Sequence, residues 1–503
     1  MSRFRALALS LFVCVAAAAL FAQSPAQPAP LTAAALFDTD RIWDVHLTID
    51  AADWSTLTPK ATPPPAPRPA SAPPAASAPP PPPPAPMPLP DVLPLELLKQ
   101  VLGGFMGPEG GRNGLSAQRG ITFDFVRASF ELGGQRFNDV AVRAKGNGSF
   151  NPIARFPKPS LKVDLNKYVK GQKLDGLSTV NLHNNIMDTS WINEVLAYRL
   201  YRDAGVPAPR TAYARVYMTM TGGENRRYLG LYSLVENVDS NFASSHLNAS
   251  GGALFKPVTI APFRFLSRDW ADYNQMYDPK DDLTTAQKER VFDFSELLTS
   301  ASDDVFRARI AEFLDLDAFA KYMAVVVWLG NPDSILRQGQ NYYAHLHPTT
   351  GRFVFIPWDQ DHSFGQFVPW ATPESQQQLD ILQPWTNRFA GAPFASQVNN
   401  NLLTRTFALP AFRQKYLAEM ATIARTLTRP ERLSAQIDEL GKVLAPVVAL
   451  EPKDGRVLSF AESLGEGTFP RPINTNVTNV AIKTFIKARH ASVLAQLQAL
   501  GVQ

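Results

Sequence analysis

The first half of the chain alternates between apolar and polar residues, as strands with one buried face do. In residues 160–165 the leucines and the valine fall on one face, while Lys162 and Asp164 fall on the other. Gly133 and Gly134 separate two such stretches in the manner of a hairpin turn. Strands are predicted at residues 44–49, 120–126, 127–132, 139–143, 160–165, 213–219 and 229–236.

Helical spacing becomes the main pattern further along the chain. A helix is predicted at residues 188–204, with Gly205 as its stop signal and Pro207 just beyond. After residue 236 helices dominate, interrupted by an extended stretch from Asn341 and a buried strand at 353–357. A sheet-rich lobe followed by a helix-rich lobe predicts an α+β fold with a cleft between the two.

The first 22 residues have the pattern of an export signal. Arg3 and Arg5 precede an apolar run from Ala6 to about Ala22, and polar residues follow at once. We therefore expect residues 1–22 to be removed and the mature protein to be secreted or periplasmic. No later run reaches the roughly 18 continuous apolar residues of a membrane span, so none is expected in the mature chain.

A proline-rich segment interrupts the domain that follows. Residues 59–90 contain 17 prolines among 32 residues, which excludes a helix or a sheet ladder there. The segment is either a semi-rigid spacer or a solvated insertion without a task. Because residues 44–49 are already strand-like, we divide the chain into a linker at 23–35 and one domain at 36–503 that contains the insertion.

Composition excludes several classes of function. The net charge is only +4, so the chain lacks the concentrated basic stripe that binds nucleic acid. Cys14 is the only cysteine and lies in the export signal, which excludes disulfides and thiolate metal sites from the mature chain. The motifs GxxxxGK[ST], HExxH, GxSxG and GxGxxG are absent.

Basic and polar residues at 143–149 form the first candidate site. They end a strand and open a loop that contains Gly146, Gly148 and several donors, which would suit an anion held by backbone N–H groups. The alternative is an ordinary surface turn.

Glu194 is the second candidate. On the predicted helix it lies among aromatic residues and away from the most charged face. A carboxylate in such a place needs a partner, and Lys162 on the polar face of its strand is a candidate. The alternative is a solvated carboxylate favoured by the helix dipole.

Acids and an amide at the ends of later elements form the third candidate. Asp333 follows an apolar helix at 319–329, Asn341 begins an extended stretch, and Asp359 and Asp361 follow the strand at 353–357. Oxygen ligands of this kind suit Mg²⁺, although aspartate in a turn is also an ordinary turn former.

Taken in order, these motifs resemble the CotH family of atypical kinases, which is named after a spore-coat protein. The matching segments are Arg143-x-Lys145-Gly-Asn147-x-Ser149, Lys158-Pro-Ser160-x-Lys162, Asp188-x-Ser190-x-x-Asn193-Glu194, Gly230-x-Tyr232-x-x-Val235-Glu236 and Ile356-Pro-Trp358-Asp359-x-Asp361-x-x-Phe364-Gly365. The resemblance runs from about Leu36 to the end of the chain, without the insertion. It implies a divergent, two-lobed protein-kinase-like fold that binds ATP between its lobes.

The resemblance also implies a role for each candidate residue. Lys162 would hold the nucleotide phosphates and pair with Glu194, and Asp333 would orient the acceptor hydroxyl and take its proton. Asn341 and Asp359 would bind Mg²⁺ or Mn²⁺, with Asp361 as a further ligand. The phosphate cover would comprise Arg143, Lys145, Asn147 and Ser149, and adenine would lie along residues 234–237, which include Glu236.

Two functions of different classes remain at this stage. The first is an exported kinase that transfers the γ-phosphoryl group of ATP to Ser or Thr hydroxyls of secreted or envelope proteins. The second is a catalytically degenerate module of the same fold that binds an envelope component or takes part in assembly. The sequence identifies neither the acceptor nor the oligomeric state.

Overall fold

A computed structural model describes residues 31–58, 95–103, 105–146, 158–366, 371–384, 400–452, 455–470 and 478–502. Strands dominate its first half and helices its second half, so the α+β class is confirmed. The export signal and the proline-rich insertion lie outside the described residues.

Seven strands form a closed barrel. Their bounds are β1 (Ile42–Asp50), β2 (Val126–Leu132), β3 (Gln135–Lys145), β4 (Ser160–Asp164), β5 (Thr179–His183), β6 (Thr211–Thr221) and β7 (Arg227–Glu236). The order around the barrel is β1-β2-β3-β4-β5-β7-β6, and β1 closes it by pairing in parallel with β6. The other neighbouring strands are antiparallel.

Two smaller sheets follow. One has the order β10-β9-β8, with bounds β8 (Ala253–Phe255), β9 (Tyr342–Leu346) and β10 (Phe353–Pro357). The other pairs β11 (Thr468–Pro470) with β12 (Thr478–Val480).

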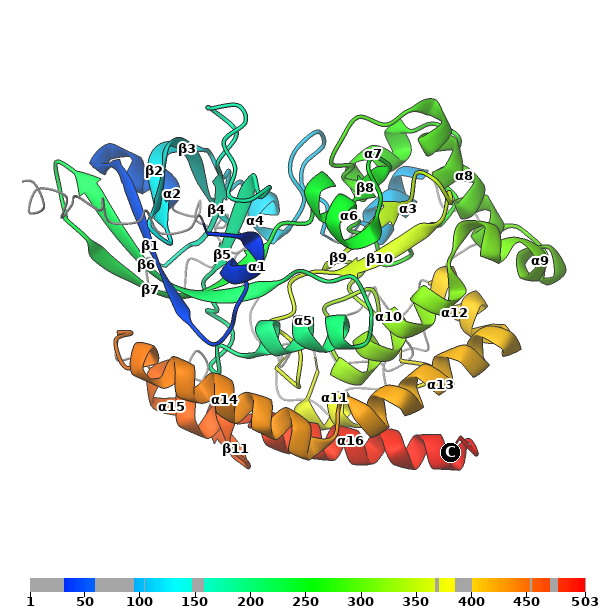
Figure 1. The fold of residues 1–503 in the computed structure, drawn as a ribbon. Coiled ribbons are helices and arrows are strands. Elements are labelled where there is room, and N and C mark those ends of the chain that lie inside the picture. The colour runs from blue at the N-terminus through cyan, green and yellow to red at the C-terminus, as the bar shows by residue number, and fades with distance from the viewer. Residues whose placement is uncertain are drawn as a thin grey trace, which may run out of the picture.

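The helices fall into an early and a late group. The early group is α1 (Ala33–Leu36), η1 (Ala51–Asp53), α2 (Trp54–Leu57), α3 (Leu95–Leu102), α4 (Leu115–Gln118), α5 (Asn193–Asp203), α6 (Ser240–Leu247) and α7 (Ala271–Tyr277). The late group is α8 (Thr285–Thr299), α9 (Asp303–Phe313), α10 (Leu316–Leu329), α11 (Pro373–Gln377), α12 (Asn401–Ala408), α13 (Pro410–Thr426), α14 (Pro430–Val448), α15 (Gly455–Leu464) and α16 (Ile482–Ala499). Figure 1 shows the barrel at the left of the view, with α13, α14 and α16 along the bottom.

Two large apolar clusters stabilise the molecule. One fills the barrel with the inward residues of its strands, such as Val142, Leu161 and Val163. The other surrounds α10, whose residues from Tyr322 to Leu329 are all buried. Alternation on β3 and β4 therefore turns their polar residues away from the barrel interior.

Most of the strand predictions are confirmed. Residues 133–134 form the two-residue turn of the β2–β3 hairpin, and both glycines have positive φ. The prediction of a strand at 120–126 is wrong, because only Val126 of that stretch joins a ladder. The strand β5 was not predicted, since all five of its residues are buried and alternation gives no signal there.

The helix predicted at residues 188–204 begins later, at Asn193. Asp188 accepts hydrogen bonds from the backbone N–H groups of Ser190 and Asn193, at 2.8 and 2.9 Å. These bonds hold a turn ahead of the helix, because a short carboxylate competes for backbone donors. The start of α5 is thereby fixed next to Glu194.

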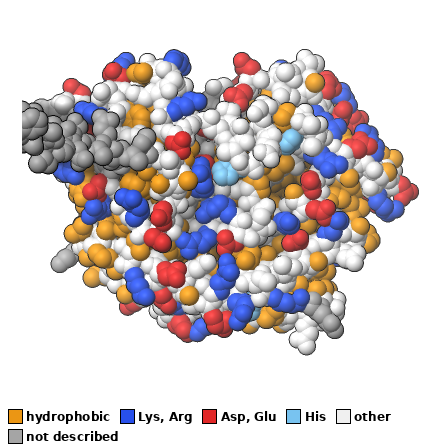
Figure 2. Space-filling model, in the orientation of Figure 1, with side chains coloured by type: hydrophobic (Ala, Val, Ile, Leu, Met, Phe, Trp, Pro, Cys, Tyr) orange, Lys and Arg blue, Asp and Glu red, His pale blue; other side chains and the backbone are white. Residues whose placement is uncertain are grey.

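The surface carries both signs of charge. Figure 2 shows Lys and Arg side chains interspersed with Asp and Glu over this face, without a large patch of either sign. Within the described residues, no helix is both long and apolar enough to cross a membrane.

Candidate functional site

Basic residues line the outer face of two neighbouring barrel strands, and a polar residue continues this face on the next strand. Arg143 and Lys145 lie two positions apart on β3, and Arg143 pairs across the ladder with Lys162 of β4. Lys162 in turn pairs with Asn181 of β5. The register thus brings three cations onto one face, where the sequence placed them in separate motifs.

A hydrogen-bonded chain runs from this face to α5. Lys145 Nζ lies 2.6 Å from His183 Nε2 and 3.2 Å from Asn181 Oδ1. His183 Nδ1 lies 2.8 Å from the nearer carboxylate oxygen of Glu194. Glu194 therefore reaches a strand lysine through an imidazole, and we call Lys145, His183 and Glu194 the relay.

The relay corrects the expected ion pair between Lys162 and Glu194. Glu194 meets His183, and Lys162 forms no ion pair among the described residues. Burial and the neighbouring Arg143 lower the pKa of Lys162. The binding of phosphate by Lys162 stays a prediction, but its pairing with Glu194 is wrong because the strand register places Lys145 nearer to His183.

Burial sets the protonation of the relay. It lowers the pKa of His183 well below its usual value, and the nearby Lys145 adds to this shift. Burial and the charge of Asp359 raise the pKa of Glu194 to about 8. The contacts fit a neutral imidazole whose Nδ1–H donates to Glu194 and whose Nε2 accepts from Lys145.

Asp359 and Asp361 follow β10 directly and face the relay. Asp359 has a left-handed backbone with φ of 54°, and its N–H donates to Tyr198 Oη of α5 at 3.0 Å. The carbonyl of Asp361 accepts from Asn193 Nδ2 at 3.1 Å, next to Glu194. Burial and the charge of Asp359 raise the pKa of Asp361 well above its usual value.

Asp333 and Asn341 are held together in the loop between α10 and β9. Gln340 Nε2 donates to Asp333 Oδ1 at 2.6 Å, and Asn341 Nδ2 donates to the Asp333 carbonyl at 2.9 Å. The N–H of Trp358 donates to the Asn341 carbonyl at 3.0 Å, which ties this loop to the start of the Asp359 turn. Burial raises the pKa of the Asp333 carboxyl to about 6, and His362 opposes this shift.

The donor set fits a hard divalent cation. Ligand atoms of His183, Glu194 and Asp359 lie within 4.8 Å of one another. Both ring nitrogens of His183 are already engaged in the relay, so oxygen atoms remain as ligands. The Asp359 carboxylate has no hydrogen-bond partner among the described residues, so both of its oxygens are available to a metal ion. The roles of Asn341 and Asp361 as further ligands stay predictions.

The other predicted residues divide into two groups. Asn147 and Ser149 lie outside the described residues. Glu236 is buried, and its carboxylate accepts from Arg210 at 2.6 Å and contacts His246 Nε2 at 3.1 Å. Hydrogen bonds from these two residues lower the pKa of Glu236 to about 2, against the effect of burial. Its side chain is therefore already engaged within the protein.

Sequence reasoning missed two residues of the site. His183 has no place in the quoted motifs, and its five-residue strand carries no alternating signal. Lys256 follows β8, and its ammonium lies 5.4 Å from the ring centroid of Trp358. Lys145 approaches the same ring at 4.8 Å. Only the tertiary structure brings these residues together.

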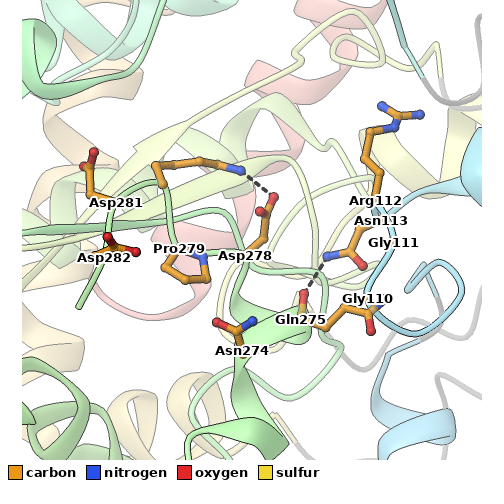
Figure 3. A pocket seen from close by; sticks show the side chains of 11 residues that line it. Gly110, Gly111, Arg112, Asn113, Asn274, Gln275, Asp278, Pro279, Asp281 and Asp282 are labelled. Carbon is orange, nitrogen blue, oxygen red and sulfur yellow. Dashed lines mark hydrogen bonds and ion pairs between the residues drawn. The ribbon is translucent and has the colours of Figure 1, made fainter. Parts of the chain in front are cut away.

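A polar cavity of about 580 Å³ adjoins the site. It lies between residues 110–113 on one side and residues 274–275 and 278–282 on the other, and Figure 3 shows these residues around it. Asn113 Nδ2 donates to the Gln275 carbonyl at 2.6 Å, which fixes one wall against the other. The N–H of Lys256 contacts the carbonyls of Tyr277 and Asp278 at 3.0 and 3.3 Å, and Asp278 lines the cavity.

Comparisons with known proteins agree with the motifs. A family model described as CotH kinase protein matches residues 142–493. The inner spore coat protein H of Bacillus subtilis (strain 168) is 21% identical over 321 residues, which cover 63% of this chain and 80% of that protein. The match thus covers most of the length of this relative.

One solved structure gives a more distant match. It is a chain from the Shewanella oneidensis MR-1 complex of the toxin–antitoxin proteins HipA and HipB with operator DNA. The identity is 15%, the TM-score is 0.29, and the match covers 64% of this chain and 58% of that chain.

Proposed function

Because the chain belongs to the CotH kinase family, we propose that it transfers the γ-phosphoryl group of ATP to a hydroxyl acceptor. One observation carries the proposal. Arg143 and Lys162 form no ion pair among the described residues, and Lys145 on the same face lies near the carboxylates of Asp359 and Glu194. A polyphosphate bridged by a divalent cation satisfies both groups at once.

Each residue then has a defined task. Arg143, Lys145 and Lys162 bind phosphate oxygens from the barrel face. Asp359, with Asp361 and the free oxygen of Asn341, would hold Mg²⁺ or Mn²⁺, which neutralises charge on the phosphates when bound. Lys145 is held in place by the relay, in the way that a direct lysine–glutamate pair acts in protein kinases.

Asp333 would receive the acceptor proton. The acceptor oxygen forms a bond to the γ-phosphorus while the bond from that phosphorus to the bridging oxygen of ADP breaks. The proton of the hydroxyl passes to the Asp333 carboxylate, whose raised pKa favours its acceptance. Positioning and electrostatic stabilisation supply most of the rate enhancement, since no covalent intermediate is required.

We also propose export and a protein substrate. The export pattern of residues 1–22 supports Ser or Thr hydroxyls of secreted or envelope proteins as acceptors. Sequencing the N-terminus of protein isolated from the producing cell tests this part. A start near Gln23 supports export, whereas an intact Met1 contradicts it.

Incubation of the signal-free protein with γ-labelled ATP and Mg²⁺ or Mn²⁺ tests the reaction itself. We expect labelling of the protein or of a generic acceptor, and loss of labelling in Asp359→Ala and Asp333→Ala. Only Asp359→Ala should also lose the rise in melting temperature that ATP and Mg²⁺ produce together. Asp304→Asn, at an exposed position on α9, is the matched control.

The test also decides between the two classes of function. Stabilisation by ATP without any labelling supports the degenerate binding module. Absence of both stabilisation and labelling in the wild-type protein contradicts nucleotide binding altogether.

A further inference from the structure

Lys256 contributes a cation to the site from outside the barrel. It follows β8, whose residues pair with β9, and its backbone N–H is bonded to the Tyr277 carbonyl. Its ammonium lies 5.4 Å from the ring centroid of Trp358 and 5.5 Å from that of Tyr343. The side chain is thus directed at the residue that precedes Asp359.

The ammonium of Lys256 lacks an acceptor among the described residues, where it forms no hydrogen bond or ion pair. The two aromatic rings offer only the weaker attraction of a cation to a π face. Burying an ammonium without a hydrogen-bond acceptor costs free energy, and Lys256 is partly buried. The position of Lys256 therefore indicates that its ammonium binds an anion.

The surrounding charges oppose a purely structural role. Besides burial, the charges of Lys280 and Arg112 lower the pKa of Lys256, and the charge of Lys256 adds to the burial that lowers the pKa of Lys145. Asp359 and Asp278 attract Lys256, but Asp278 is already paired with Lys280. Cations therefore converge here from two sheets and from the cavity wall.

The neighbouring cavity leaves room for a ligand on this side. Its wall at residues 278–280 is fixed to β8, because the N–H of Lys280 donates to the Leu254 carbonyl at 2.9 Å. Arg112 borders the cavity, and its charge reaches Arg143 on the barrel face.

We propose that Lys256 binds the phosphate chain of the nucleotide from the second sheet, across from Arg143 and Lys162 of the barrel. The inference rests on the proposed function for the identity of the nucleotide. A ligand with one negative charge cannot neutralise the four cations Arg143, Lys145, Lys162 and Lys256, whereas a polyphosphate can. Lys256 thereby joins the barrel and the β8–β10 sheet through one bound anion.

Binding measurements on a ligand series test this inference. Affinities of wild type, Lys256→Met and Lys256→Arg are measured for ATP with Mg²⁺, ADP with Mg²⁺, adenosine and inorganic tripolyphosphate. We expect Lys256→Met to weaken ATP and tripolyphosphate binding by about 10- to 100-fold, with adenosine unchanged. Lys256→Arg should restore most of the loss, and Lys442→Met on exposed α14 is the matched control.

The outcomes separate this inference from the proposed function. Unchanged affinities, or an equal loss for adenosine and ATP, would overturn the role of Lys256. Tripolyphosphate binding that depends on Lys256, in a wild-type protein that transfers no phosphoryl group, supports the inference while the proposed function fails. Binding of neither nucleotide nor tripolyphosphate by the wild type overturns both. Melting temperatures without ligand show whether each variant is folded.

Discussion

Glu194 illustrates how much one residue's role depends on its contacts. Its carboxylate is bonded to His183, and His183 is bonded to Lys145, so three residues act as one unit. Burial raises the pKa of Glu194 and lowers that of His183, which favours a neutral imidazole between the two groups. Replacing any one of the three residues therefore also removes a hydrogen bond that positions its neighbour.

The relay predicts strong coupling in mutant cycles. Lys145→Met and His183→Ala should each weaken productive ATP binding by about 10- to 100-fold, because the first removes the phosphate-binding lysine and the second removes a hydrogen bond that holds it. The double mutant should lose little more than either single mutant. His246→Ala, which removes a partner of Glu236, is the control. Additive losses measured by titration calorimetry would argue against the relay.

Asp333 predicts a specific pH dependence of stability. Burial raises its pKa from 3.8 to about 6, so the folded protein binds more protons than the unfolded chain between these values. Its contribution to the free energy of unfolding therefore falls as pH rises through this window, by at most about 3 kcal/mol. Asp333→Asn should remove this decrease and be more stable than wild type at pH 7. Urea titrations in EDTA at pH 4 and pH 7 measure the difference.

The same protonation predicts a rate effect. Phosphoryl transfer should decline below about pH 6, since a protonated Asp333 cannot accept the proton of the acceptor. The stability measurement has its own contradicting outcome. If the free energy of unfolding of Asp333→Asn decreased with pH as steeply as that of the wild type, another carboxyl would be the cause of the decrease.

At the scale of elements, the end of α10 positions the loop that contains Asp333. Gly330 ends the helix with positive φ, and Arg489 of α16 is fully buried against this end. Its guanidinium donates to the carbonyls of Val327 and Trp328 at 2.9 and 3.2 Å, and to that of Leu379 at 2.6 Å. A cation at the C-terminal end of a helix also complements the helix dipole.

Loss of this contact should destabilise the protein. Arg489→Met would leave several buried carbonyls without donors, and we expect the free energy of unfolding to fall by about 3–5 kcal/mol. Lys487→Met, two residues away in an exposed pair with Glu466, should change it by less than about 0.5 kcal/mol. Chemical denaturation of both variants measures the contrast. Equal stability of the two would show that α10 ends independently of α16.

At the scale of the whole molecule, one buried ion pair connects the barrel to the C-terminal helices. Lys158 Nζ lies 2.9 Å from Glu451 Oε2, although 293 positions separate the two residues. Glu451 also accepts from the backbone N–H of Leu231 on β7. Gly230 makes room for the pair, because a Cβ there would lie 2.6 Å from Lys158 Cε.

Breaking this pair should weaken the attachment of the C-terminal helices. Glu451→Gln leaves a buried lysine without its counter-charge, and we expect a loss of about 3–5 kcal/mol. Hydrogen exchange should show faster exchange in β7 and α14, with exposed Glu462→Gln as the control. Unchanged exchange in both elements would contradict a connecting role for Glu451.

The sequence by itself determined the local elements and the kinds of chemistry. Alternation located most barrel strands, the Gly133–Gly134 turn located a hairpin, and the motif with Asp359 and Asp361 indicated oxygen ligands after a buried strand. These features are encoded over a few residues, because backbone periodicity and turn chemistry are local properties. The order of the motifs likewise indicated the family.

Only the tertiary structure decided which charged residues meet. The pairing of β1 with β6 closes the barrel and joins residues that are more than one hundred and sixty positions apart in the sequence, such as Val45 and Val216. The register of β3, β4 and β5 places Lys145 next to His183, so that Lys145 rather than Lys162 is connected to Glu194. Lys256 reaches Trp358 from another sheet. Strand register and sheet packing join residues that are distant in sequence, so no local pattern specifies them.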